Sequence, residues 1–153
     1  MDIRQLRAGN LVTTNGKPAG TTNGNVYKVL STDSANRLDE LKLIGGATIE
    51  ILDGEYRTTV GAWLDYLDPI EITDDLLRKI GFPFWQKSCS GRVYLRLGDY
   101  SIEIDPIDKY ILYIRNNRGY EILSARIKYL HDIQNLIFDI TNLELNVENL
   151  ITK

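Results

Sequence analysis

Apolar and polar side chains alternate along residues 92–123 more regularly than anywhere else in this chain of 153 residues. Val93, Leu95 and Leu97 fall on one side of an extended segment, and the tyrosine and arginine between them fall on the other. A period of two predicts strands with one buried face. Gly98-Asp99 has the glycine-first order that a type II′ hairpin turn prefers. The segment therefore predicts a three- to four-stranded antiparallel meander whose apolar face needs a cover.

An amphipathic helix predicted over residues 125–141 supplies this cover. On a helical wheel its apolar side chains gather on one side: Ile127, Leu130, Ile133, Leu136, Ile137 and Ile140. His131 falls at the edge of the apolar arc, so we expect a partly exposed side chain that bonds the adjacent sheet. Gln134 falls inside the arc, where a buried amide needs hydrogen-bond partners. Both residues are therefore predicted to have structural roles.

The first seventy residues predict short strands separated by tight turns. The strand segments, rich in β-branched and aliphatic residues, are 11–13, 26–30, 41–44, 48–52 and 56–60. The turn signals between them are Asn15-Gly16, Asn23-Gly24, Gly45-Gly46 and Asp53-Gly54. Five strands of this length predict a small closed or half-closed barrel of the SH3-like kind.

A boundary is expected at Asp68-Pro69, because the proline interrupts the strand pattern and a helix signal follows. Thr73 is a predicted N-cap, and Gly81 is placed to end the helix. The chain is therefore predicted to be α+β. Its expected parts are a small β-barrel-like region at 1–68 and an α+β region at 69–153, which contains a helix at 74–80, the sheet at 92–123, the helix at 125–141 and a tail. The two parts either share one core or have a core each.

The composition gives no support for catalysis or for a secreted or membrane protein. The formal net charge is −3, and Cys89 and His131 are the only residues of their types. A single cysteine excludes an internal disulfide, and one histidine with one cysteine does not make a zinc site. No glycine-rich nucleotide motif occurs, and no apolar run of about 18 residues occurs. We expect a cytoplasmic protein that is not an enzyme and has no cofactor, metal site or catalytic residue.

A binding surface is the remaining candidate site. Residues 85–128 contain eight basic and five acidic side chains, although the whole chain is acidic. The predicted sheet places Arg92, Tyr94 and Arg96 on one strand face, and Tyr113 with Arg115 extends it. Interleaved tyrosine and arginine are typical of protein interfaces, of single-stranded nucleic-acid platforms, and of the solvated side of an amphipathic sheet. Nucleic acid is the less favoured partner because the net charge is negative.

Three segments resemble a family of small uncharacterised proteins from phages, prophages and mobile elements of Bacteroidetes bacteria. They are Leu6-Arg7-Ala8-Gly9-Asn10-Leu11-Val12, then Pro69-Ile70-Glu71-Ile72-Thr73 with Leu76-Leu77 and Gly81-Phe82, and finally Tyr129-Leu130-His131-Asp132-Ile133-Gln134-Asn135-Leu136. The resemblance spans roughly residues 3–145 and brings no assigned activity or catalytic residue.

The expected function is that of a non-enzymatic binding or adaptor protein. The resemblance implies that it is phage-encoded, and we expect it to act on a protein partner in the bacterial cytoplasm. One alternative is a structural or packaged virion component. Another is a nucleic-acid-binding module that uses the tyrosine and arginine face. A homo-oligomer is also compatible with the predicted sheets, since their edge strands are open to pairing.

Overall fold

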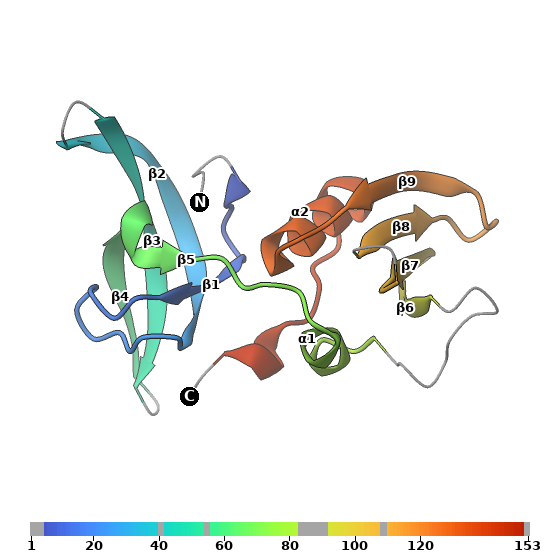
Figure 1. Cartoon of the computed structure of the whole chain (residues 1–153), viewed down its shortest axis with the longest axis horizontal. Helices are drawn as coiled ribbons and strands as arrows, with labels where there is room; N and C mark the ends of the chain where they lie inside the picture. The colour runs from blue at the N-terminus through green and yellow to red at the C-terminus, as the bar shows by residue number, and fades with distance from the viewer. Residues whose placement is uncertain (1–4, 40–41, 54–55, 83–91, 108–109, 152–153) are drawn as a thin grey trace. The chain divides into compact units, whose positions relative to one another are not determined.

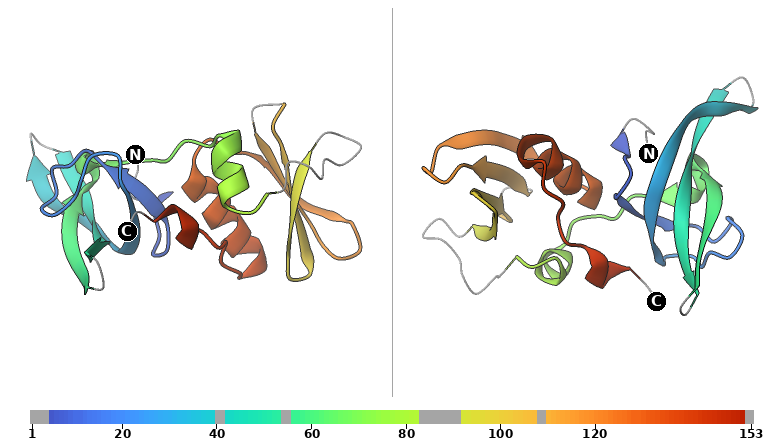
Figure 2. Two further views of the ribbon diagram at one scale, coloured as in Figure 1. Left: turned by 90° about the horizontal axis from the view of Figure 1, so that it is seen from below. Right: turned by 180° about the vertical axis from the view of Figure 1, so that it is seen from behind.

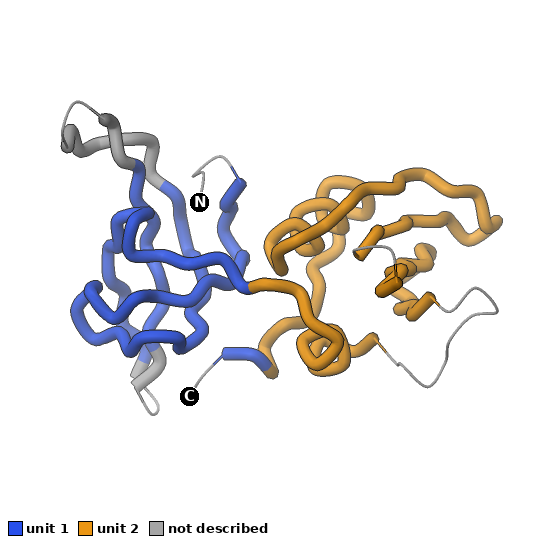
Figure 3. The backbone as a smooth tube through the Cα atoms, in the orientation of Figure 1, with its two compact units in different colours: residues 1–70, 150–153 blue, residues 71–149 orange. Residues whose placement is uncertain are grey.

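The computed structural model describes residues 5–39, 42–53, 56–82, 92–107 and 110–151 (Figure 1). The chain forms two compact units, one of residues 1–70 with 150–153 and one of residues 71–149 (Figure 3). Each unit contains its own antiparallel sheet, and strands outnumber helices among the described elements. The prediction of an α+β fold is therefore confirmed.

The first unit holds one five-stranded sheet. Its elements are β1 (Leu11–Thr14), β2 (Val26–Asp39), β3 (Lys42–Asp53), β4 (Tyr56–Trp63), the 3-10 helix η2 (Leu64–Tyr66) and β5 (Leu67–Asp68). The strands are hydrogen-bonded in the order β4-β3-β2-β1-β5, and all neighbouring pairs are antiparallel. The short strand β5 was not predicted. It pairs with β1, so the last strand of this sheet along the chain lies beside the first one.

The core of this unit lies on one face of the sheet. Val29 on β2 pairs with Ile49 on β3, and both side chains are completely buried. Period-two alternation brings apolar side chains from all five strands and from the N-terminal segment to the same cluster: Leu6, Val12, Tyr27, Val29, Ala47, Ile49, Ala62 and Leu67.

The prediction of a turn at Gly45-Gly46 was wrong. Both glycines lie within β3, so the two expected strands at 41–44 and 48–52 are a single strand. A Cβ atom on Gly46 would lie 3.2 Å from the carbonyl oxygen of Ala62 and 3.5 Å from the Trp63 ring. Because Gly46 has no side chain, the neighbouring strand β4 can approach closely, and this is one reason why glycine occurs inside strands.

A buried asparagine organises the N-terminal segment. The Oδ1 atom of Asn10 accepts a hydrogen bond from the Arg7 N–H at 2.9 Å, and the Asn10 side chain is fully buried. Gly9 has φ +91°, and its N–H donates to the Val29 carbonyl at 2.8 Å. Asparagine and glycine thus both have a structural role in this turn.

The helix predicted at 74–80 is α1 (Asp74–Lys79), and its predicted boundary residues are confirmed. The Thr73 Oγ1 accepts a hydrogen bond from the Leu76 N–H at 3.1 Å, as an N-cap side chain should. Gly81 has φ +98°, and the Phe82 N–H then donates to the Leu77 carbonyl at 2.9 Å. These bonds satisfy backbone groups that the helix ends would otherwise leave unpaired.

The second unit contains the predicted four-stranded meander. Its strands are β6 (Val93–Leu97), β7 (Tyr100–Asp105), β8 (Ile111–Arg115) and β9 (Glu121–Arg126), in the order β6-β7-β8-β9. Leu97 pairs with Tyr100 across the predicted two-residue turn, where Gly98 has φ +57° and Asp99 has no positive φ. This pattern agrees with a type II′ turn. The last strand extends beyond the predicted end at residue 123.

The amphipathic helix α2 (Leu130–Thr141) lies along one side of this sheet (Figures 1 and 2). Leu130, Ile133 and Ile137 are completely buried, as are apolar side chains on the facing side of β7 and β8. The predicted helix start at residue 125 was wrong, because Ala125 and Arg126 pair with β8 instead. The helix is followed by a tail that includes the 3-10 helix η3 (Glu148–Leu150), and Leu145 and Val147 of this tail are buried.

Candidate functional site

The sheet of the second unit places all five predicted binding residues on its polar face. Tyr94 on β6 pairs with Glu103 on β7, which pairs in turn with Tyr113 on β8. In the neighbouring row Arg96 pairs with Ser101, which pairs with Arg115. Arg92 immediately precedes β6. The apolar residues between these positions are buried on the opposite face, so this polar face is the side turned away from the apolar core.

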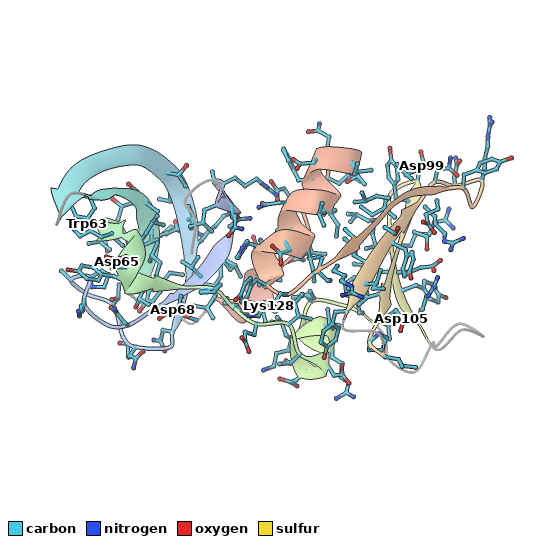
Figure 4. The ribbon with its side chains drawn as sticks, turned by 45° about the horizontal axis from the view of Figure 1, so that its top comes forward. Trp63, Asp65, Asp68, Asp99, Asp105 and Lys128 are labelled. Atoms are coloured by element: carbon cyan, nitrogen blue, oxygen red, sulfur yellow. The ribbon has the colours of Figure 1, made fainter. Side chains whose placement is uncertain are left out.

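Carboxylates from β7 hold the first predicted arginine in place. The Arg92 Nη1 lies 3.5 Å from Glu103 Oε2, and its Nε donates to Asp105 Oδ2 at 3.5 Å. The guanidinium also lies over the ring of Tyr113, at 3.9 Å from the ring centroid. Figure 4 shows Asp105 at one end of β7 and Asp99 at the turn beyond the other end. Arg92 is thus fixed by two carboxylates and by a cation–π contact.

The second predicted arginine completes the same network. The Arg115 Nε lies 3.3 Å from Glu103 Oε1, and its Nη2 lies 3.6 Å from Glu121 Oε2. Glu103 therefore joins two guanidinium groups, with its side chain only 20% exposed. A network of several charges holds its geometry better than an isolated surface pair does. We call the set Arg92, Glu103, Asp105, Tyr113 and Arg115 the ion-pair network.

Tyr94 and Arg96 lie beside the ion-pair network and are available for contact. The Tyr94 side chain is 38% exposed, and Arg96 is exposed on the same strand. Within the part of the chain that the structure describes, Arg96 forms no ion pair. An exposed tyrosine next to an exposed arginine, both on a rigid strand, is the composition found in the centres of many protein interfaces.

The polar face carries little net charge. Four arginines (Arg92, Arg96, Arg115 and Arg126) share it with three carboxylates (Glu103, Asp105 and Glu121). The basic excess counted along residues 85–128 is thus largely neutralised once the strands pair. The sequence pattern did not reveal this because Glu103 and Asp105 come from a different strand than the arginines that they bind.

His131 was predicted to be partly exposed, and this was wrong, since its side chain is only 1% exposed. Its ring is stacked on that of Tyr129 with centroids 5.5 Å apart, and its Nε2 lies 3.6 Å from Asp132 Oδ1. Neither ring nitrogen forms a hydrogen bond within the described residues. Burial lowers the pKa of His131, and the Asp132 carboxylate offsets part of this effect. Gln134 is also buried, as predicted.

Asp132 has a structural task of its own. Its Oδ2 accepts hydrogen bonds from the backbone N–H groups of Lys128 at 2.9 Å and Tyr129 at 2.8 Å. The carboxylate therefore caps the start of α2 from inside the helix, where it also complements the helix dipole. Oδ2 is thus used for capping, and only Oδ1 lies near His131, at 3.6 Å from Nε2.

Tyr110 links α1 to the second sheet, and no pattern in the sequence predicted this contact. It adopts φ +53°, which is rare for a residue other than glycine, and its hydroxyl donates to Asp74 Oδ1 at 3.1 Å. Burial raises the pKa of the Tyr110 phenol, and the bond to Asp74 raises it further. Both effects favour the neutral phenol, which is the form that donates the hydrogen bond to Asp74.

The described residues give no support for a metal site or for a membrane-spanning helix. They contain no group of three or more histidine, cysteine, aspartate or glutamate side chains placed to hold a metal ion. Asp65 and Asp68, labelled in Figure 4, lie in η2 and β5 of the first unit and belong to no such group. Cys89 lies outside the described residues. None of the helices in the described ranges combines the length and the apolar composition needed to cross a bilayer.

Comparison with known proteins found no similarity that would assign a family. No protein-family model, no curated protein and no solved structure matches the chain.

Proposed function

We propose that this chain is a non-enzymatic binding protein that contacts a protein partner through the polar face of its second sheet. The binding residues in this proposal are Arg92, Tyr94, Arg96, Tyr113 and Arg115. The observation that carries it is the ion-pair network, which orders the centre of the face and leaves Tyr94 and Arg96 exposed beside it. Ordered tyrosine and arginine side chains lose little conformational entropy on binding, which favours tight association.

A folded protein fits this face better than nucleic acid does. Binding a phosphate backbone releases counterions and is driven by unpaired basic groups. Arg92 and Arg115 are already paired with carboxylates, so contact with phosphates would require these ion pairs to break. A mixed-charge protein surface can instead contact both the arginines and the carboxylates.

The remaining parts of the proposal concern origin and fold type. We propose that the first unit is a small SH3-like barrel. The order of its strands and the 3-10 helix before β5 support this proposal. A phage-encoded adaptor of the bacterial cytoplasm is the role that fits the resemblance of the three sequence segments. A packaged virion component would instead use the C-terminal tail and the helix that contains Gln134 for assembly, and mass spectrometry of purified particles distinguishes it from the adaptor.

Affinity purification from the source organism tests the proposed function. The tagged full-length chain is compared with a Tyr94→Ala/Arg96→Ala variant and with a matched Arg118→Ala/Tyr120→Ala control, in which the same residue types are removed from an exposed turn outside the face. We expect one protein to be recovered in near-stoichiometric amount by the wild type and the control. The Tyr94→Ala/Arg96→Ala variant should recover at least about tenfold less.

Two results would count against the proposal. Recovery of the same partner by both variants would move the binding site elsewhere on the chain. Retention of nucleic acid that is lost steeply with added salt, without any protein partner, would favour the nucleic-acid module instead.

A further inference from the structure

The sheet of the second unit ends at β6 on one side and at β9 on the other, and β9 has the larger number of exposed side chains. At β9 the strand order places β8 on one side. On the other side, within the described residues, backbone pairing is found only beyond the end of the strand, where the Ile72 N–H donates to the Lys128 carbonyl at 3.0 Å. The side chains of Glu121, Ile122, Ser124 and Arg126 are all exposed, and Ile122 is 45% exposed in spite of its apolar character. An exposed edge strand is a ready template for pairing with another strand.

The backbone groups that point outward from β9 follow from its pairing with β8. The Ile127 N–H donates to the Tyr110 carbonyl at 3.0 Å, and the pairing continues without a shift from Arg126 to Leu123. In an antiparallel ladder, hydrogen-bonded pairs alternate with pairs whose N–H and C=O groups point away from each other. Ala125 and Leu123 therefore bond to β8, and the N–H and C=O groups of Ser124 and Arg126 point to the open side.

The residues of β9 are complementary to those of a second, antiparallel copy of β9. In an antiparallel pair of two β9 strands centred on Ser124, this serine lies opposite its own equivalent, and Ile122 lies opposite the second copy's Arg126. A register shift between Ile114 and Arg115 of β8 leaves Glu121 opposite Arg115, on the polar face that Arg126 shares. The Arg126 guanidinium of each copy is then within reach of the Glu121 carboxylate of the other.

The two charged residues are suited to this exchange. Arg126 is exposed and forms no ion pair within the described ranges. Glu121 is 42% exposed and lies 3.6 Å from Arg115, which also binds Glu103 more closely. A second carboxylate is therefore not needed to hold Arg115, and Glu121 can contact another basic group as well. The small Ser124 at the centre lets the two backbones approach to hydrogen-bond distance.

We propose that two copies of this chain associate through antiparallel pairing of their β9 strands, with Ser124 on the twofold axis and reciprocal ion pairs between Glu121 and Arg126. The arrangement is isologous and closes after two copies, so it does not lead to fibres. It joins two four-stranded sheets into one continuous sheet and places the polar faces of both copies on the same side. This inference goes beyond the proposed partner binding and does not depend on it.

Sedimentation velocity on the purified full chain tests the association. Over a concentration series, the wild type should approach twice the mass of the single chain, which is 17.5 kDa. Arg126→Glu places a carboxylate against the second copy's Glu121, so its dissociation constant should rise at least about tenfold. Arg118→Glu makes the same charge change at an exposed position outside β9 and should leave the dissociation constant unchanged. Circular dichroism on the dissociated chains checks that both variants are folded.

Disulfide cross-linking tests the register directly. Opposite residues in a hydrogen-bonded antiparallel pair have Cα atoms about 5.5 Å apart, which is within the range that a disulfide spans. In a Cys89→Ser background, Ser124→Cys should form a covalent dimer on mild oxidation, and Asp99→Cys at the exposed β6–β7 turn should not.

The proposal requires both a doubled mass and the cross-link at position 124. A wild-type chain that stays monomeric at every concentration would overturn it. A dimer that does not form the Ser124→Cys cross-link would also overturn it, because the association would then use another surface or another register.

Discussion

Replacing Glu103 with glutamine should weaken the second unit, because this carboxylate joins both arginines of the ion-pair network. Its two oxygens lie 3.5 Å from Arg92 and 3.3 Å from Arg115, and the three side chains are between 20% and 31% exposed. Exposed pairs contribute roughly 0.2–1 kcal/mol each, and partial burial reduces the screening by salt. Each arginine keeps a second carboxylate, so we expect a net loss of about 1 kcal/mol in the free energy of unfolding.

The assay is denaturant unfolding followed by near-ultraviolet circular dichroism at low and at high salt. Asp99→Asn is the matched control, since it makes the same change at an exposed carboxylate with no ion pair among the described residues. The loss caused by Glu103→Gln should shrink at about 1 M salt, where the screening length falls to about 3 Å. A double-mutant cycle with Arg115→Gln should show a coupling free energy of about 0.5 kcal/mol.

Equal stability of Glu103→Gln and Asp99→Asn, with no coupling to Arg115, would show that the ion-pair network does not stabilise the second unit. The polar face would then be a set of independent solvated side chains with no ordered centre. That result would also remove the observation on which the proposed binding function rests.

Three further predictions concern stability. Burial lowers the pKa of His131 below its unfolded value of about 6.5, so the unfolded chain binds more protons than the folded chain near this pH. The contribution of His131 to the free energy of unfolding should therefore be fully present above about pH 6.5 and decline as the pH falls through that value. His131→Gln should reduce the decline in the denaturant midpoint between about pH 7.5 and about pH 5.5. Thr73→Ala should cost about 1 kcal/mol by removing the N-cap of α1, and Thr73→Ser should cost less in the same assay. Gly81→Ala should cost about 1 kcal/mol because alanine is strained at φ +98°, and a variant as stable as the wild type would show that the helix end can rearrange.

Local sequence signals were sufficient to predict helix ends and turns, because a short segment determines its own structure there. Thr73 and Gly81 mark the ends of α1 through bonds to residues no more than four or five positions away. Gly98-Asp99 sets its hairpin in the same way. Such contacts depend on neighbours in the chain, so they can be predicted without knowledge of the fold.

Prediction failed where a distant strand decides the outcome. Ala125 and Arg126 are good helix formers, but pairing with β8 keeps them in a strand. Gly45-Gly46 has the composition of a turn, and the close approach of Trp63 on β4 explains why Gly46 lies within a strand instead.

The same difference between local and distant contacts applies to the candidate site. Alternation along one strand correctly placed Arg92, Tyr94 and Arg96 on one face. The carboxylates that neutralise this face lie on β7, so their contacts depend on strand register and could not be read from the arginine segment alone. The full burial of His131 was likewise missed, since a wheel position at the edge of an apolar arc does not specify what packs against it.

Site-specific photocross-linking at position 94 shows whether the polar face of the second sheet contacts a protein. A benzophenone amino acid is incorporated at Tyr94, on the polar face, or at Tyr120, outside it, and the source cells are irradiated. We expect a discrete adduct with one other protein from position 94 and not from position 120. No protein adduct from position 94, or an adduct that nuclease removes, would contradict a protein-binding role for this face.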